Sequence, residues 1–198
     1  MRLLRSLMAV AILTSGCAGT GSRVAGSTAQ ILGTVVKRSD DIYAPLYRTH
    51  AAQVYGSPAY AALAKEKGGA AAVAYYTEQM RPWDNGVNVI KAARASVFAI
   101  ATAAESTRRA DRTASIVEAA AYSTGAVIGM LQTIDTLGAH LPPEMTTSLG
   151  HACIFVTALG RGVNLAADKL PKACNTLART GQLGAPERPA GTPGPATH

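Results

Sequence analysis

The chain has 198 residues, of which 48% are hydrophobic and 16% are charged, and its formal net charge at pH 7 is +7. This length is typical of one domain that buries a core of its own. The positive charge would suit anionic lipids or cell-wall polymers. However, it is spread along the chain and no aromatic residues interleave with it, so we expect no nucleic-acid partner.

The first sixteen residues have the pattern of a secretory signal peptide. Arg2 and Arg5 form a basic start, Leu7–Leu13 is an apolar run, and three small residues follow it. The run is much shorter than the roughly 20 residues that a transmembrane helix needs. We therefore predict that residues 1–16 are a signal peptide that is removed, and not a retained membrane anchor.

Cys17 follows the small residues directly. This arrangement resembles the lipobox of bacterial lipoproteins, although that class prefers leucine three residues before the cysteine, where this chain has Thr14. The resemblance covers residues 1–20 and implies that Cys17 is diacylated and becomes the mature N-terminus. Ala18 follows in place of aspartate, which in enteric-type lipoproteins implies sorting to the periplasmic face of the outer membrane. The alternative is an ordinary secretory signal with a coincidental cysteine.

Helical patterns dominate the rest of the chain, so we expect an all-α fold. Residues 17–28 are rich in Gly, Ser and Thr and predict a flexible linker after the lipidated cysteine. A helical domain is expected over 29–180. It should begin with short helices at 29–37, 42–55, 58–67 and 70–80, separated by breaks at Ser39–Asp41, Gly56–Pro58, Gly68–Gly69 and Arg81–Asn85.

Three longer helices are predicted between residues 84 and 165, over about 84–108, 111–137 and 144–165. Apolar residues recur at helical spacing in each of them, and Gly138 ends the second. A last short helix, 168–180, is interrupted by Pro171. Residues 181–198 contain four prolines and few apolar residues, which predicts a disordered tail. The expected architecture is an irregular helical bundle.

Cys153 and Cys174 are the two cysteines that remain once Cys17 is assigned to lipid. In an oxidising compartment such a pair predicts a disulfide. Two buried free thiols are an alternative. A metal site that also uses His140 and His151 lacks the paired short spacings of zinc sites, so we expect no metal.

Aromatic residues are concentrated in the first half of the chain. Aromatic side chains with a polar group are enriched at recognition surfaces, but they also lie at the edges of ordinary cores. We treat five of them as a candidate binding surface, with core packing as the alternative: Tyr43, Tyr47, Tyr75, Tyr76 and Trp83.

The sequence offers little catalytic chemistry. It has no His-Glu-x-x-His pair, no Gly-x-Ser-x-Gly motif and no Walker-type loop. Glu78 and Asp84 flank Trp83, as acids in a glycan-cleaving site would, but Asp84 also fits a helix N-cap. We expect no cofactor and no enzymatic activity.

Together these features predict a non-catalytic, membrane-tethered periplasmic lipoprotein. We expect it to be a binding or assembly module whose partners are the membrane, through its lipid, and an envelope protein or the cell wall. The first alternative is a membrane-active protein that forms a pore with an apolar hairpin of residues 87–104 and 119–134, or a prophage lysis or exclusion lipoprotein held by the same lipid anchor. A cell-wall-acting enzyme is the weaker alternative.

Overall fold

The computed structural model describes residues 20–106, 109–180 and 182–183. All regular structure in these residues is helical, which confirms the predicted all-α fold. The predicted signal peptide, Cys17 and most of the predicted tail lie outside the described residues. The elements are α2 (Thr20–Tyr55), α3 (Pro58–Lys67), α4 (Gly69–Ser106), α5 (Arg109–Thr136), α6 (Pro143–Gly162), the 3-10 helix η1 (Ala167–Lys169) and α7 (Lys172–Thr180).

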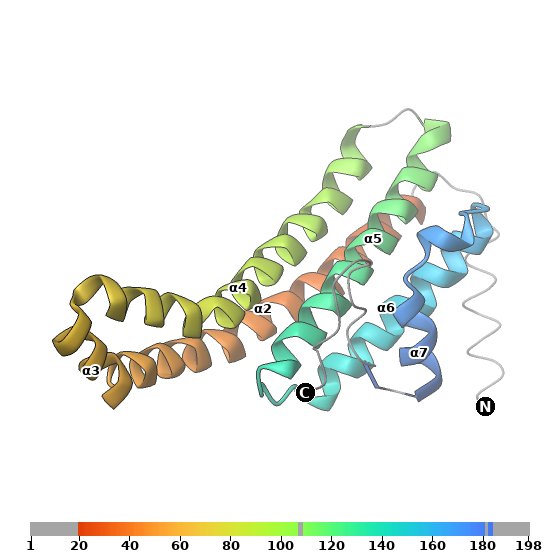
Figure 1. Cartoon of the computed structure of the whole chain (residues 1–198). Coiled ribbons are helices and arrows are strands. Elements are labelled where there is room, and N and C mark those ends of the chain that lie inside the picture. Colours follow the sequence, from red (N-terminus) through yellow and green to blue (C-terminus); the bar gives the residue numbers. More distant parts are fainter. Residues whose placement is uncertain (1–19, 107–108, 181, 184–198) are drawn as a thin grey trace.

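The molecule is a helical bundle from which a helical hairpin extends (Figure 1). The helices α2 and α4 run antiparallel, and α3 lies in the connection between them. Helix α5 packs along both, α6 packs on α5 and α2, and α7 packs on α6. Beyond α5, the end of α2, all of α3 and the start of α4 project from the bundle. We call this projection, residues 48–82, the arm.

The predicted linker and the predicted break in the first helix are wrong. Helix α2 is continuous over 36 residues and already includes residues 20–28. Ser39 lies in the predicted break, but it is buried and its hydroxyl donates to the carbonyl of Val35 at 2.8 Å. Asp40 reaches across to Arg94 on α4. Because these polar side chains have partners, the helix continues where local preference favours a stop.

The predicted turn at Arg81–Asn85 is also helical. Helix α4 is continuous over 38 residues and contains Pro82. Proline removes one helical hydrogen bond and bends a helix, and α4 bends where the arm leaves the bundle (Figure 1). The predicted short helix at 58–67 is confirmed as α3, whereas those at 29–37 and 42–55 are parts of α2 and that at 70–80 is the start of α4. Helices α2 and α4 exceed α5 and α6 in length.

The predictions for the second half of the chain agree closely with the structure. Helix α5 ends at Thr136, and Gly138 follows with a φ of +83°. Pro171 separates η1 from α7. The predicted apolar stripe of α5 is buried in the core and consists of Ile116, Ala120, Thr124, Val127, Leu131 and Ile134.

The predicted disulfide is present. Cys153 on α6 and Cys174 on α7 are bonded, with their Cα atoms 5.2 Å apart, and both side chains are buried. The bond fastens the short helix α7 to the bundle. In the chain-entropy model a loop of this size is stabilised by roughly 3 kcal/mol.

Candidate functional site

An aromatic cluster joins α2 to α4 near the base of the arm. The indole of Trp83 stacks on Tyr43, with ring centroids 5.6 Å apart, and on His50 at 4.6 Å. The hydroxyl of Tyr43 donates to the carbonyl oxygen of Trp83 at 2.6 Å. The hydroxyl of Tyr47 donates to Oδ1 of Asp84 at 2.8 Å. The cluster therefore fixes the register between the two helices.

Tyr43 is almost completely buried, which favours core packing, the alternative in the prediction, for this residue. Its side chain is only 1% exposed. Gly86 lies against its ring, and a Cβ at that position would overlap the hydroxyl of Tyr43. Burial raises the pKa of Tyr43, so the hydroxyl stays protonated and remains a donor. Tyr43 is a structural contact between α2 and α4.

The other four predicted residues are half-buried and fall into two groups. Tyr47 and Trp83 belong to the aromatic cluster, whereas Tyr75 and Tyr76 lie on the arm. The hydrogen bond to Asp84 raises the pKa of Tyr47 to about 12, and burial adds to this shift. Tyr76 also raises the pKa of Tyr47 electrostatically, so this residue of the arm lies close to the cluster.

A groove follows the seam between α2 and α4 on one face of the hairpin. An ion pair between Asp40 and Arg94, 2.8 Å long, crosses it. On one side of this pair lies a pocket of about 360 Å³, and on the other a pocket of about 500 Å³; Asp40 and Arg94 line both. We call the two pockets together the α2–α4 groove.

The two pockets of the groove have different linings. The smaller pocket has Tyr43, Val87 and Ile90 at its base, and Tyr47, Arg48 and Lys91 around it. The larger pocket is lined by Gly33, Val36, Val97 and Phe98, with Lys37 and Asp41 at its edge. Phe98 is 68% exposed. The sequence analysis missed Arg48, Lys91 and Phe98, because each looks like an isolated surface residue until α2 and α4 are paired.

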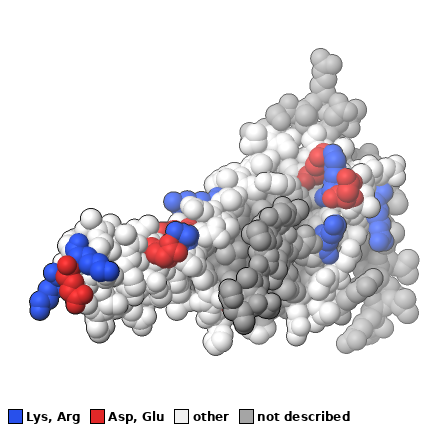
Figure 2. Space-filling model, in the orientation of Figure 1, with Lys and Arg blue, Asp and Glu red and all other residues white. Residues whose placement is uncertain are grey.

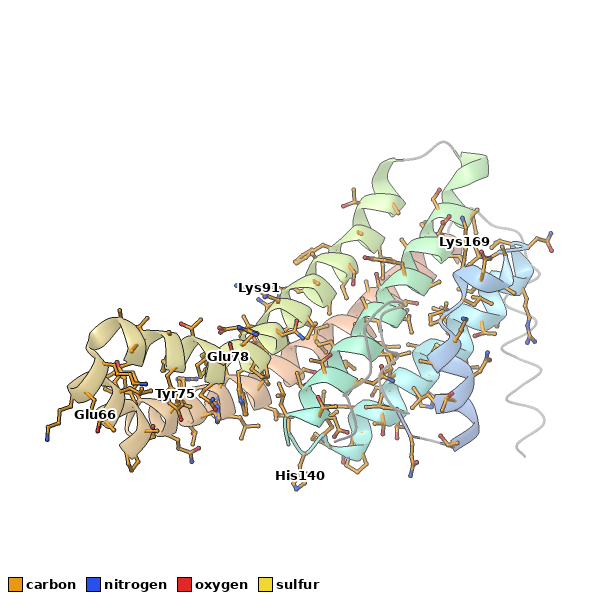
Figure 3. The ribbon with its side chains drawn as sticks, viewed as in Figure 1. Glu66, Tyr75, Glu78, Lys91, His140 and Lys169 are labelled. Atoms are coloured by element: carbon orange, nitrogen blue, oxygen red, sulfur yellow. A yellow bond between two sulfur atoms is a disulfide. The ribbon has the colours of Figure 1, made fainter. Side chains whose placement is uncertain are left out.

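The polar residues considered for catalysis do not converge. Glu78 forms an ion pair with Arg81, and Asp84 accepts the hydroxyl of Tyr47. Glu78 lies on the arm and His140 in the turn after α5 (Figure 3). Lys169 lies at the end of the molecule opposite the arm, where its Nζ is 2.6 Å from Oε1 of Glu118. Charged groups on the face in Figure 2 are likewise separated by uncharged surface. No group of three His, Cys, Asp or Glu that could hold a metal occurs within the described residues.

A further pocket, of about 430 Å³, lies between α4, α5 and the start of α7. It is lined mainly by small and apolar residues, including Gly125, Gly129 and Pro171. At its edge Nε2 of Gln132 donates to the carbonyl of Leu183 at 2.7 Å. Leu183 is half-buried and packs on the core, so this first part of the predicted tail follows the bundle.

Comparison of the chain with protein-family models, with curated proteins and with solved structures found no match.

Proposed function

We propose that this protein is a non-catalytic lipoprotein of the bacterial envelope, anchored through acyl chains on Cys17 at the periplasmic face of the outer membrane. Its α2–α4 hairpin is the surface that binds or positions a partner. Two acyl chains hold a protein stably on a membrane, whereas one gives only reversible binding.

The disulfide is the observation that carries this proposal. Disulfides persist in oxidising compartments such as the periplasm. The bond also occupies Cys153 and Cys174, so of the three cysteines only Cys17 is left for acylation. The disulfide therefore supports export to an oxidising compartment, and it supports acylation at Cys17, as the lipobox-like sequence also implies.

The length of α2 supports a role for the hairpin away from the membrane. Helix α2 begins at Thr20, three residues after Cys17, and has 36 residues. At 1.5 Å per residue it is about 54 Å long. A lipid on Cys17 would place the start of α2 near the membrane. The arm, with the ring contact between Tyr55 and Tyr60 at its end, would then lie far from the bilayer.

A membrane-active protein is the second candidate, because one helical segment could cross a membrane by length and composition. This segment is Thr113–Thr136, and 56% of its apolar window is buried inside the bundle. Core helices of ordinary folded proteins meet the same criteria. The burial of this segment favours the tethered bundle.

Metabolic labelling with an alkynyl palmitate tests the anchor. The wild-type protein should incorporate the label, and Cys17→Ala should not. The matched control is the double variant Cys153→Ala, Cys174→Ala, which should still be labelled because it keeps Cys17. Labelling of Cys17→Ala, or an unlabelled wild-type protein that keeps residues 1–16, would contradict the proposal.

A further inference from the structure

The larger pocket of the α2–α4 groove exposes apolar surface. Phe98 is mostly exposed beside the pocket of about 500 Å³, with Val36 and Val97 in its lining. When a ligand covers a large apolar side chain, apolar surface is removed from water, and this lowers the free energy of the complex. The four charged residues that line this pocket form two ion pairs, Lys37 with Asp41 at 3.6 Å and Arg94 with Asp40 at 2.8 Å, so their charges are balanced. This half of the groove therefore suits an uncharged apolar group.

The smaller pocket of the groove is cationic. Three basic side chains, Arg48, Lys91 and Arg94, line it together with one carboxylate, Asp40, which pairs with Arg94. Lys91 makes no ion pair within the described part of the chain, and it projects from the middle of α4 (Figure 3). Arg48 donates from Nε to the carbonyl of Ala44, which is uncharged.

One further carboxylate, that of Asp84, lies beside this pocket, where it accepts the hydrogen bond of Tyr47 and keeps its negative charge. Asp84 forms no ion pair with Arg48 or Lys91 within the described residues, so these two cations have no ion-pair partner there. Such charges attract an anion, and guanidinium and ammonium groups both bind carboxylate or phosphate.

We propose that the α2–α4 groove binds an anionic amphiphile: an alkyl or acyl chain that ends in a carboxylate or a phosphate. The apolar chain lies in the larger pocket against Phe98, and the headgroup lies in the smaller pocket between Arg48 and Lys91. The volumes of the two pockets are within the range of small-molecule sites, which are largely apolar with a few placed polar groups.

The order of the two pockets along α2 agrees with such a ligand. Gly33 marks the apolar end and Arg48 the cationic end, and the 1.5 Å rise per residue places them about 22 Å apart along the helix. This inference deepens the proposed function, because it names the ligand class of the hairpin. If lipid anchors Cys17, the apolar end of the groove is the end nearer the membrane.

Fluorescence titration of the Cys17→Ala protein with dodecyl phosphate and with dodecanoate, below the concentrations at which they form micelles, tests the proposal. Trp83 is the only tryptophan in the chain, and it stacks on Tyr43 at the base of the cationic pocket, so its emission reports binding there. We expect one ligand per protein, bound about tenfold more tightly than dodecyltrimethylammonium. Tighter binding of the phosphate identifies a phospholipid-type headgroup, and tighter binding of dodecanoate a fatty acid.

Variants with matched controls locate the ligand in the groove. Lys91→Gln and Arg48→Gln should each weaken binding of dodecyl phosphate by about tenfold, whereas Lys65→Gln on α3 should not change it. Phe98→Ala should weaken binding of the same ligand by a similar factor, whereas Tyr122→Ala should not, although Tyr122 on α5 is 70% exposed. All of these side chains are exposed, so the variants should fold.

Three results would overturn the inference: no binding, equal affinity for dodecyltrimethylammonium, or equal effects of Lys91→Gln and Lys65→Gln. The anchor is tested separately by whether the Cys17→Ala protein is recovered without detergent. If it stays in the membrane, the anchor proposal fails. The titration with dodecyl phosphate is then repeated on protein in phosphatidylcholine vesicles. Weaker binding by Lys91→Gln than by Lys65→Gln would still show that the groove binds the anion.

Discussion

Gly86 is the residue on which the contact between α2 and α4 depends most closely. Its missing side chain leaves the space that the hydroxyl of Tyr43 occupies. Tyr43 is buried, and its hydroxyl donates to the carbonyl of Trp83. The side chain therefore cannot move aside without losing its core packing and this hydrogen bond.

Gly86→Ala should therefore lower the free energy of unfolding, by about 1–3 kcal/mol, as overpacking of a filled core does. Gly129→Ala on α5 is the matched control, since a Cβ there meets no atom within 4 Å. In a helix this exchange should be neutral or stabilise by up to about 1 kcal/mol. Urea unfolding of the two variants measures the difference, and equal stability of both would contradict the close contact.

Tyr47 makes the stability of the hairpin depend on pH in the alkaline range. Its pKa is raised to about 12 by the hydrogen bond to Asp84, from an ordinary value of about 10. The folded state thus holds this proton more tightly than the unfolded state. The stabilisation is complete below about pH 10 and is lost as the pH rises through about 12.

Tyr47→Phe should reduce this alkaline loss. Between pH 9 and pH 12 the free energy of unfolding of the wild-type protein should fall more steeply than that of the variant. Titration of tyrosinate absorbance gives a second measurement. In Asp84→Asn the raised pKa of Tyr47 should fall toward the ordinary value for tyrosine. Identical pH profiles for wild type and Tyr47→Phe would show that the hydrogen bond contributes nothing.

The helices differ in how far they can be predicted from sequence. Helix α5 could be predicted because its apolar residues recur at helical spacing and Gly138 ends it. Helices α2 and α4 could not, because Ser39 and Pro82 are local stop signals. Two of the contacts that stabilise these helices, Tyr43 with Trp83 and Asp40 with Arg94, join residues 40 and 54 positions apart, and no local pattern contains them.

The candidate site was predictable only in part for the same reason. Aromatic composition drew attention to Tyr47, which lines the smaller pocket of the groove, and to Trp83, which stacks on Tyr43 at the base of that pocket. The same criterion selected Tyr43, which is buried, since it cannot separate core from surface. Lys91 and Arg48 come together only when α2 pairs with α4, so sequence spacing carried no signal for them.

Substitution of Pro82 tests whether packing on α2 keeps α4 helical although proline disfavours a helix interior. A proline inside a helix costs roughly 3 kcal/mol relative to alanine. Pro82→Ala should therefore raise the free energy of unfolding, by about 1–3 kcal/mol if the bend relaxes only in part. Pro58→Ala is the control, because Pro58 begins α3, where proline is tolerated, and its effect should stay within about 0.5 kcal/mol. A destabilised Pro82→Ala protein would mean that the arm requires the bend.

Viewed as a whole, the protein combines a disulfide-closed bundle with a long hairpin that begins close to the proposed lipid. The bundle buries the apolar faces of its helices, including most of α5. We propose that a lipid on Cys17, and not the partly buried segment Thr113–Thr136, holds the protein on a membrane. The central claim is therefore that the anchor is the lipid and not a helix.

Detergent phase partitioning of the wild-type protein and of Cys17→Ala expressed with a cleavable signal peptide, each fractionated from cells, tests that claim most directly. We predict that the wild-type protein enters the detergent phase with the outer membrane, and that Cys17→Ala is recovered as a soluble periplasmic protein. If Cys17→Ala also enters the detergent phase, the apolar helices themselves engage lipid. The tethered bundle would then be wrong, and the membrane-active alternative would take its place.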